Sequence, residues 1–187
     1  MDTETTGLDP AYGHALVEVA TVVIDDGAIA DTWTSLVRPG RSIPADAVAV
    51  HGITDAMVGD APSPAPVAAE LRKRCGDLPL VMHNALFDLP FLIAWMRQAG
   101  QPPLLSPIID TLGLARGLVG AGGNSLGALA ERFDLPREPR HRALGDAMTT
   151  ARLFLALAER WERERGVRTL VELAAASQDA LRQAATR

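Results

Sequence analysis

A long hairpin of apolar and β-branched residues, followed by alternating short strands and helices, limits the fold of this chain most. Residues 15–39, ALVEVATVVIDDGAIADTWTSLVRP, predict two strands joined at Asp-Asp-Gly, since β-branched runs favour sheet and this tripeptide favours a tight turn. A polar, proline-containing stretch holding VHGIT follows. Helical patterns then cover residues 63–75, 85–100, 111–118, 124–136, 141–165 and 169–185, with short apolar strands within 77–84 and 106–110. This order predicts an α/β fold with a mixed sheet.

Composition bounds the class of protein. The 187 residues are 48% hydrophobic and 22% charged, which suits a single globular domain. We expect this domain at residues 1–165, with 166–187 forming a C-terminal helix that is part of it or appended to it. The net charge of −5 excludes a global positive field for nucleic acid. One cysteine excludes an intramolecular disulfide, and without a signal peptide or membrane-length apolar run we expect a cytoplasmic protein with no membrane contact.

Two acids stand at the start of the chain, in MDTETTG. If this opening ends a strand, Asp2 and Glu4 point to the same side, because residues two apart on a strand share a face. Like charges held together need a cation or a raised pKa. From these residues alone, a solvated acidic turn is the alternative.

Two further acids lie where predicted strands lead into helices. Asp88, in HNALFDLPFL, lies in the first turn of a helix directly after a buried strand, a place that suits either a helix-dipole partner or a functional site. Asp146, in HRALGDAMTTA, follows His141 by five residues. Five helical steps turn a side chain by about 140°, so the two converge only if His141 lies in the approach to the helix, which Pro139 favours. A surface histidine is the alternative.

In order, these segments resemble the motifs of the DEDDh superfamily of 3′→5′ exonucleases. DTETTG, HNALFD and HRALGDA match its acid-x-acid, its acid after a strand and its histidine-x4-acid on a late helix. VHGIT is similar to a segment of the branch that contains the proofreading epsilon subunit of bacterial DNA polymerase III. The resemblance spans residues 2 to about 155, and it implies a ribonuclease-H-like fold with a mixed five-stranded sheet flanked by helices.

The resemblance also implies a chemistry. Two Mg²⁺ or Mn²⁺ ions would be held by four carboxylates, namely Asp2, Glu4, Asp88 and Asp146. His141 would take the proton from the attacking water, which suits a side chain that titrates near neutral pH. Hard oxygen ligands favour these ions over zinc, and paired ions offset the charge of phosphodiester hydrolysis. The expected enzyme releases nucleoside 5′-monophosphates from nucleic-acid 3′ ends.

Candidate substrate contacts surround the acids. We expect binding of the 3′-terminal nucleotides by Thr5, Thr6, Gly7, Leu8, His51, Asn84 and Phe87. Gly7 lets the backbone approach the nucleotide, while Leu8, His51 and Phe87 offer faces on which unstacked bases pack. For Leu8 and Phe87 the alternative is core packing. Three arginines beside His141 either hold phosphates or form a solvated loop: Arg137, Arg140 and Arg142.

The resemblance implies an apolar strand before Asp2, whereas only Met1 precedes it in this sequence. We therefore expect a shortened first central strand, and we hypothesise that the protein starts upstream of Met1.

Several functions stay open at this point. The leading interpretation is an exonuclease acting on single-stranded DNA 3′ ends in proofreading or repair. RNA 3′-end trimming of the ribonuclease T kind is a close variant, whereas oligoribonuclease is disfavoured because its first motif has methionine at the position of Thr5. A non-catalytic nucleic-acid-binding module on the same fold is the alternative from another class. We recognise no polymerase- or clamp-binding motif after residue 165, so a DNA polymerase partner, a stand-alone enzyme and any oligomeric state remain open.

Overall fold

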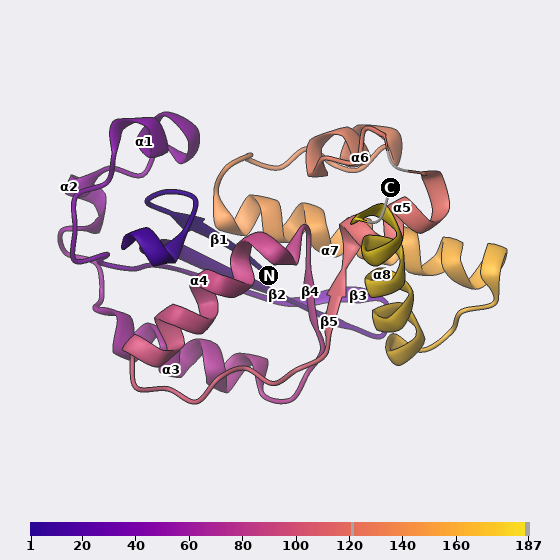
Figure 1. Cartoon of the computed structure of the whole chain (residues 1–187), viewed down its shortest axis with the longest axis horizontal. Helices are drawn as coiled ribbons and strands as arrows, with labels where there is room; N and C mark the ends of the chain where they lie inside the picture. The colour runs from indigo at the N-terminus through magenta and orange to yellow at the C-terminus, as the bar shows by residue number, and fades with distance from the viewer. Residues whose placement is uncertain (121, 186–187) are drawn as a thin grey trace.

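Within the part of the chain that the structure describes, residues 1–120 and 122–185, five strands form two hydrogen-bonded ladders (Figure 1). The structure is a computed structural model. In the first ladder, β1 (Asp2–Thr5), β2 (Leu16–Asp25) and β3 (Ala28–Leu36) follow one another antiparallel. In the second, β4 (Leu80–Met82) and β5 (Ile108–Asp110) are parallel. The α/β fold class and the hairpin are confirmed, and Asp26 and Gly27 form its turn with positive φ angles.

The helices lie close to their predicted ranges. They are the 3-10 turn η1 (Pro10–Tyr12) and the helices α1 (Ala45–His51), α2 (Asp55–Val58), α3 (Pro64–Cys75), α4 (Ala85–Gln98), α5 (Thr111–Val119), α6 (Leu126–Arg132), α7 (Ala143–Arg165) and α8 (Leu170–Ala185). The sequence did not predict α1 and α2, because helices of seven and four residues are too short to show a period. Among the described residues, no helix is long and apolar enough to cross a membrane.

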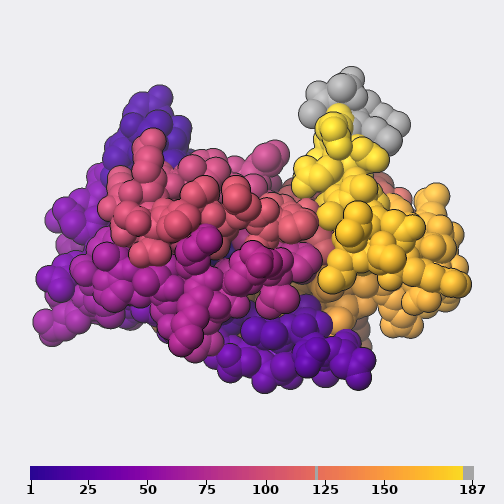
Figure 2. Space-filling model, turned by 90° about the horizontal axis from the view of Figure 1, so that it is seen from below, coloured from indigo at the N-terminus to yellow at the C-terminus, as the bar shows by residue number. Residues whose placement is uncertain are grey.

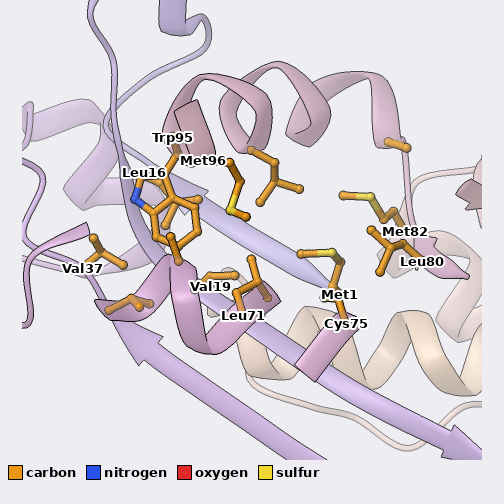
Figure 3. Packing of buried hydrophobic residues seen from close by; sticks show 14 residues of the cluster. Met1, Leu16, Val19, Val37, Leu71, Cys75, Leu80, Met82, Trp95 and Met96 are labelled. Atoms are coloured by element: carbon orange, nitrogen blue, oxygen red, sulfur yellow. The ribbon is translucent and has the colours of Figure 1, made fainter. Parts of the chain in front are cut away.

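Helices cover both faces of the first ladder. Val19 on β2 belongs to an apolar cluster with Leu71 of α3 and Trp95 of α4, and Figure 3 shows these side chains in one cluster that also contains Met1. Ala20, the next residue, packs with Ala143 and others of α7 on the opposite face. This alternation follows from the two-residue period of a strand. Small side chains between β2 and α7 allow the helix to lie close to the sheet.

The two ladders meet at the start of β1. The α-amino group of Met1 donates a hydrogen bond to the carbonyl of Val81 on β4, at 2.7 Å. Beyond Ala20, β2 diverges from this junction, and an apolar groove of about 410 Å³ separates it from β4. The five expected strands are therefore present, but their hydrogen bonding is divided into a ladder of three and a ladder of two. Strand β1 has only four residues, and the bond to β4 comes from Met1, the residue before it.

The C-terminal helix packs against the rest of the chain. A capping box starts this helix: Thr169 Oγ1 accepts from the Glu172 N–H, and Glu172 Oε2 accepts from the Thr169 N–H. Gly113 of α5 lies so close to Ser177 of α8 that a Cβ would collide with the Ser177 carbonyl. Figure 2 shows the yellow C-terminal residues gathered at one end of the molecule beside the orange end of α7. Residues 186–187 of the predicted helix lie outside the described residues, and the division at residue 165 stays a prediction.

Candidate active site

Strand β1 and the start of α7 bring three carboxylates together. Asp2 and Glu4 lie two apart on β1, so both side chains leave the same face. With Asp146 they offer oxygen atoms that all lie within 4.8 Å of one another. A pocket of about 400 Å³ opens over them, bounded by β1, the loop after it, α1, and the N-terminal ends of α4 and α7. The solvated acidic turn is thereby ruled out for Asp2 and Glu4.

Asp88 enters the same pocket from the first turn of α4. Its side chain is buried, and Oδ1 accepts a 2.6 Å hydrogen bond from the Thr3 hydroxyl on β1. The turn before it is fixed by Asp110 at the end of β5, whose carboxylate accepts from the backbone N–H groups of Asn84, Ala85 and Leu112, each at 2.9 Å. These bonds hold Asn84 in the left-handed conformation from which α4 starts.

His141 lies in the approach to α7, as its convergence with Asp146 requires. Its φ of 55° is left-handed, and its backbone N–H donates to Asp146 Oδ2 at 2.9 Å. Gly145 makes the close turn possible, because a Cβ there would collide with the carbonyl of Pro139. The His141 backbone thus takes one oxygen of Asp146, and both side chains line the pocket.

The acids carry strongly perturbed pKa values. Burial, with the charges of Asp88, Asp146 and Glu4, raises the pKa of Asp2 well above its usual range. Burial first, and then neighbouring carboxylates, raises the pKa of Glu4 to about 8. Burial raises the pKa of Asp88 to about 6, although the Thr3 hydroxyl opposes this. Burial also raises the pKa of Asp146, against the His141 N–H. The cluster thus concentrates negative charge that only cations or protons offset.

This donor set fits hard divalent cations. The ligand atoms are carboxylate oxygens alone, as Mg²⁺ and Mn²⁺ prefer. Three of the carboxylates already converge within 4.8 Å. Asp88 stands slightly apart but is close enough for its charge to raise the pKa of Asp2. Bound cations would offset the cost of burying these charges and, at Asp2 and Glu4, the repulsion between neighbouring carboxylates.

Six of the seven expected substrate contacts line the pocket, namely Thr5, Gly7, Leu8, His51, Asn84 and Phe87. Leu8 is 82% exposed at its mouth, so core packing is excluded for this residue. Buried His51 accepts the Ile53 N–H at Nδ1, whereas its Nε2 has no partner among the described residues. Thr6 corrects the expectation: it is fully buried outside the pocket lining, and its hydroxyl accepts the Ala15 N–H at 2.9 Å. It anchors the loop instead.

The three arginines beside His141 lie in different environments. Arg142 pairs with Glu18 at 2.7 Å, which disfavours phosphate binding, one of the two alternatives left open for this residue. Arg137 and Arg140 line a separate polar pocket of about 600 Å³, which shares His141 and Asp146 with the first.

Sequence reasoning missed the residues that hold the acids in place. Glu18, Asp110 and Thr3 are buried polar residues that bond to the loops or acids of the site. A signal existed for two of them. Glu18 is the one charged residue in the run ALVEVATVVI, and Asp110 directly follows the apolar PII. A charge inside an apolar strand needs a partner, so each marked a buried contact. Asp46 and Val50 of α1 also line the pocket and gave no signal.

An α/β fold that gathers carboxylates and a histidine beneath an open pocket defines the class of this chain as a nuclease-type protein. The sequence profile of the exonuclease family, also called RNase T, matches residues 1–154, and the chain belongs to this family. It is 45% identical over 161 residues to a DNA polymerase III subunit epsilon-like protein of Rhodobacter capsulatus, covering 83% of this chain and 23% of that protein. It is 37% identical over 158 residues to DNA polymerase III PolC-type of Bacillus subtilis, covering 83% of this chain and 11% of that protein. The chain thus spans about a quarter or less of these relatives.

Solved structures agree with this assignment. Exonuclease X, in complex with 5′ overhanging duplex DNA, superposes with a TM-score of 0.74 at 32% identity, covering 94% of this chain and 96% of that one. The nuclease domain of 3′hExo, a DEDDh family member bound to rAMP, has the same fold, with a TM-score of 0.74 at 20% identity over 85% of this chain and 90% of that one. The expected membership of an exonuclease family and the ribonuclease-H-like fold class are confirmed.

Proposed function

We propose that this chain is a 3′→5′ exonuclease domain that hydrolyses phosphodiester bonds at nucleic-acid 3′ ends and releases nucleoside 5′-monophosphates. The convergence of Asp2, Glu4 and Asp146 within 4.8 Å carries the proposal. Membership of the exonuclease family supports it. The complete set of acids and histidine argues against a non-catalytic binding module.

The carboxylates act as the holders of two Mg²⁺ or Mn²⁺ ions in this proposal. Asp2, Glu4 and Asp146 share one group of oxygen atoms, and Asp88 adds its charge from α4. When bound, such ions offset the negative charge of the reacting phosphate and lower the pKa of water. Thr3 keeps Asp88 oriented through its short hydrogen bond. The four acids therefore serve in their ionised forms.

His141 acts as the general base. Its backbone is tied to Asp146, whereas among the described residues no hydrogen bond engages its imidazole. A ring nitrogen is thus available to take a proton from water in the pocket. Because the side chain is exposed, that proton passes on to solvent without crossing the protein.

The rim of the pocket suits the terminal nucleotides of a single strand. Leu8, Val50 and Phe87 present apolar surface around its mouth, and such faces bind bases with little sequence preference. We infer DNA as the substrate class, in proofreading or repair, since Exonuclease X was solved with DNA and two relatives are named for DNA polymerase III. RNA trimming is the outcome that the assay below distinguishes.

The test uses single-stranded DNA and RNA of equal sequence, labelled at either end, with Mg²⁺, Mn²⁺ or EDTA. We expect stepwise shortening of DNA from the 3′ end, release of 5′-monophosphates, and no product with EDTA. Faster shortening of RNA than of DNA would mean that RNA, and not DNA, is the substrate class. Binding of either strand without any product, with both ions supplied, would instead favour the non-catalytic module. A polymerase partner is tested separately, by co-purification of the tagged chain.

A further inference from the structure

An ion pair between a buried glutamate and a partly exposed arginine lies behind the acid cluster. Glu18 on β2 is 3% exposed, and it pairs with Arg142, which lies between His141 and the first residue of α7. Glu18 Oε1 accepts from Arg142 Nη2 at 2.7 Å. Glu18 Oε2 accepts from Arg142 Nε at 3.1 Å and from the Ala143 backbone N–H at 2.9 Å. One carboxylate therefore holds both the side chain and the backbone of the loop that leads into α7.

The arrangement does not make Glu18 a further ligand for cations. Glu18 stands opposite Glu4 in the register of β1 and β2, but both of its oxygens are already taken, and it is not part of the converging trio. Like charges opposite each other on neighbouring strands repel. The charge of Glu18 raises the pKa of Glu4, and that of Arg142 lowers it. Arg142 thus offsets a carboxylate that would otherwise add to the negative charge of the cluster.

The backbone beside this pair needs a constraint. The left-handed φ of His141 is uncommon for a residue with a side chain, and such conformations persist where surrounding contacts hold them. Asp146 holds the loop from one side through the His141 N–H. Glu18 holds the next two residues from β2. The two sets of bonds fix the direction in which the His141 side chain projects from the backbone.

We propose that Glu18 is a positioning residue: its bonds to Arg142 and Ala143 hold His141 over the pocket and keep Asp146 beside Asp2 and Glu4. Glu18 itself touches neither substrate nor reacting atoms. Because the rim residues come from the loop after β1, from α1 and from α4, loosening the loop before α7 impairs the reaction while leaving most substrate contacts in place. The measurement of kcat that tests this proposal rests on the proposed function, whereas the measurement of hydrogen exchange does not.

The experiment compares the full chain with Glu18→Gln. The amide keeps the size of the side chain, and Arg142, whose side chain is 42% exposed, turns to solvent, so the fold is retained. We expect faster amide hydrogen exchange confined to the segment 139–146. With single-stranded DNA, kcat falls roughly 10- to 100-fold, the usual cost of losing an orienting partner, and KM stays within about twofold.

Matched variants separate positioning from general effects of charge. Asp31→Asn makes the corresponding change in an ion pair between β3 and α3, where Asp31 contacts Arg74 at 2.9 Å, and it leaves kcat unchanged. Arg142→Lys keeps the charge without the two-pronged contact, so its kcat lies between those of wild type and Glu18→Gln. The double variant Glu18→Gln/Arg142→Gln is no slower than Glu18→Gln alone, because both changes remove one interaction.

Two outcomes overturn the proposal: exchange of 139–146 and kcat both unchanged in Glu18→Gln, or exchange faster throughout the protein. The second would give Glu18 a general structural role. A wild-type chain without nuclease activity would refute the proposed function, while hydrogen exchange would still decide whether Glu18 holds the loop.

Discussion

Asp146 is both part of the acid cluster and the acceptor for the loop before its own helix. Asp146→Asn keeps an oxygen for the His141 N–H but removes the charge that the cations need. We expect hydrolysis to fall to a small fraction of wild type and the cation-free fold to be at least as stable, since burial raises the pKa of this acid. Asp60→Asn, at an exposed acid that lines neither of the two pockets beside Asp146, is the control. End-labelled DNA and thermal unfolding measure both effects, and substantial residual activity would refute the ligand role.

His141 has the opposite character, because its imidazole is exposed and only its backbone is bonded. His141→Ala removes the proposed base without disturbing the carboxylates. Hydrolysis should slow by roughly 10²- to 10⁴-fold, the usual contribution of a general base, with Mn²⁺ affinity unchanged in a calorimetric titration. The pH–rate profile should change its shape as well. A profile identical to that of wild type would show that another group takes the proton.

For individual residues, sequence spacing identified the acids of the site better than it identified the residues that hold those acids in place. Asp2 and Glu4 were recognisable because two-residue spacing on a strand gives one face, and the structure bears this out. Glu18 and Asp110 act across 124 and 26 residues, and no local pattern encodes such a pairing. Thr6 shows the converse error. Its place in a motif suggested a substrate contact, but its hydroxyl faces the Ala15 N–H.

Strand β1 carries two acids whose pKa values are raised by burial. The stability of the fold should therefore depend on pH. For Glu4, the folded pKa of about 8 lies above its ordinary value of 4.5, so the folded state binds the extra proton between these limits. Without divalent ions, stability should therefore fall as pH rises from about 4.5 to 8. Asp88, with a pKa of about 6, adds to the fall in the lower part of this window.

Cations reverse this trend, because they bind the ionised carboxylates and compete with protons. The increase in Tm caused by 5 mM Mn²⁺ should be larger at pH 8 than at pH 5.5, and it should shrink in Asp146→Asn. Differential scanning calorimetry with EDTA as the reference measures it. Equal increases at both pH values would mean that the ions bind elsewhere.

Helix α8 lies beyond residue 154, where the match to the exonuclease family ends. A substitution at its contact with α5 shows whether its packing stabilises the fold. Gly113→Ala would place a methyl group against the Ser177 carbonyl, so α5 and α8 must move apart. We expect a loss of about 1–3 kcal/mol, the usual cost of overpacking, seen as a lower midpoint in urea. Gly122→Ala faces open space and should be nearly neutral. No loss in Gly113→Ala would show that α8 contributes little to the fold.

The elements themselves were mostly predictable, with clear exceptions. The hairpin turn depends on the neighbouring residues Asp26 and Gly27, and the capping box of α8 depends on Thr169 and Glu172. Because these interactions are local, the sequence is sufficient to predict both. Helices α1 and α2 depend on tertiary contacts, since Ile53 and Val58 pack into a small cluster with Val17 of β2. The divided sheet was not predictable from local pattern either, because strand pairing depends on contacts between distant segments.

At the scale of the whole molecule, an apolar groove lies between the two ladders. Val22 and Ile24 of β2 line one side, and Leu80 and Val81 of β4 line the other. Residues 21–25 of β2 pair with β3 but not with β1, so one backbone edge faces the groove. The Met1 α-amino group lies buried at its end, and this burial lowers its pKa. One extended segment in the groove would pair with both edges and join the ladders.

Fusing five alternating apolar and β-branched residues ahead of Met1 tests this arrangement. The fusion replaces a buried amine with an amide and places two or three apolar side chains in the groove, at roughly 1.5–3 kcal/mol each. Ordering the segment offsets much of that gain. We expect a net stabilisation of about 2 kcal/mol, or a Tm higher by about 4–8 °C. A fusion of equal length with two prolines and two aspartates can neither pair nor bury its side chains, so it should leave Tm unchanged. Equal Tm values for the two fusions would mean that the groove does not accept a strand.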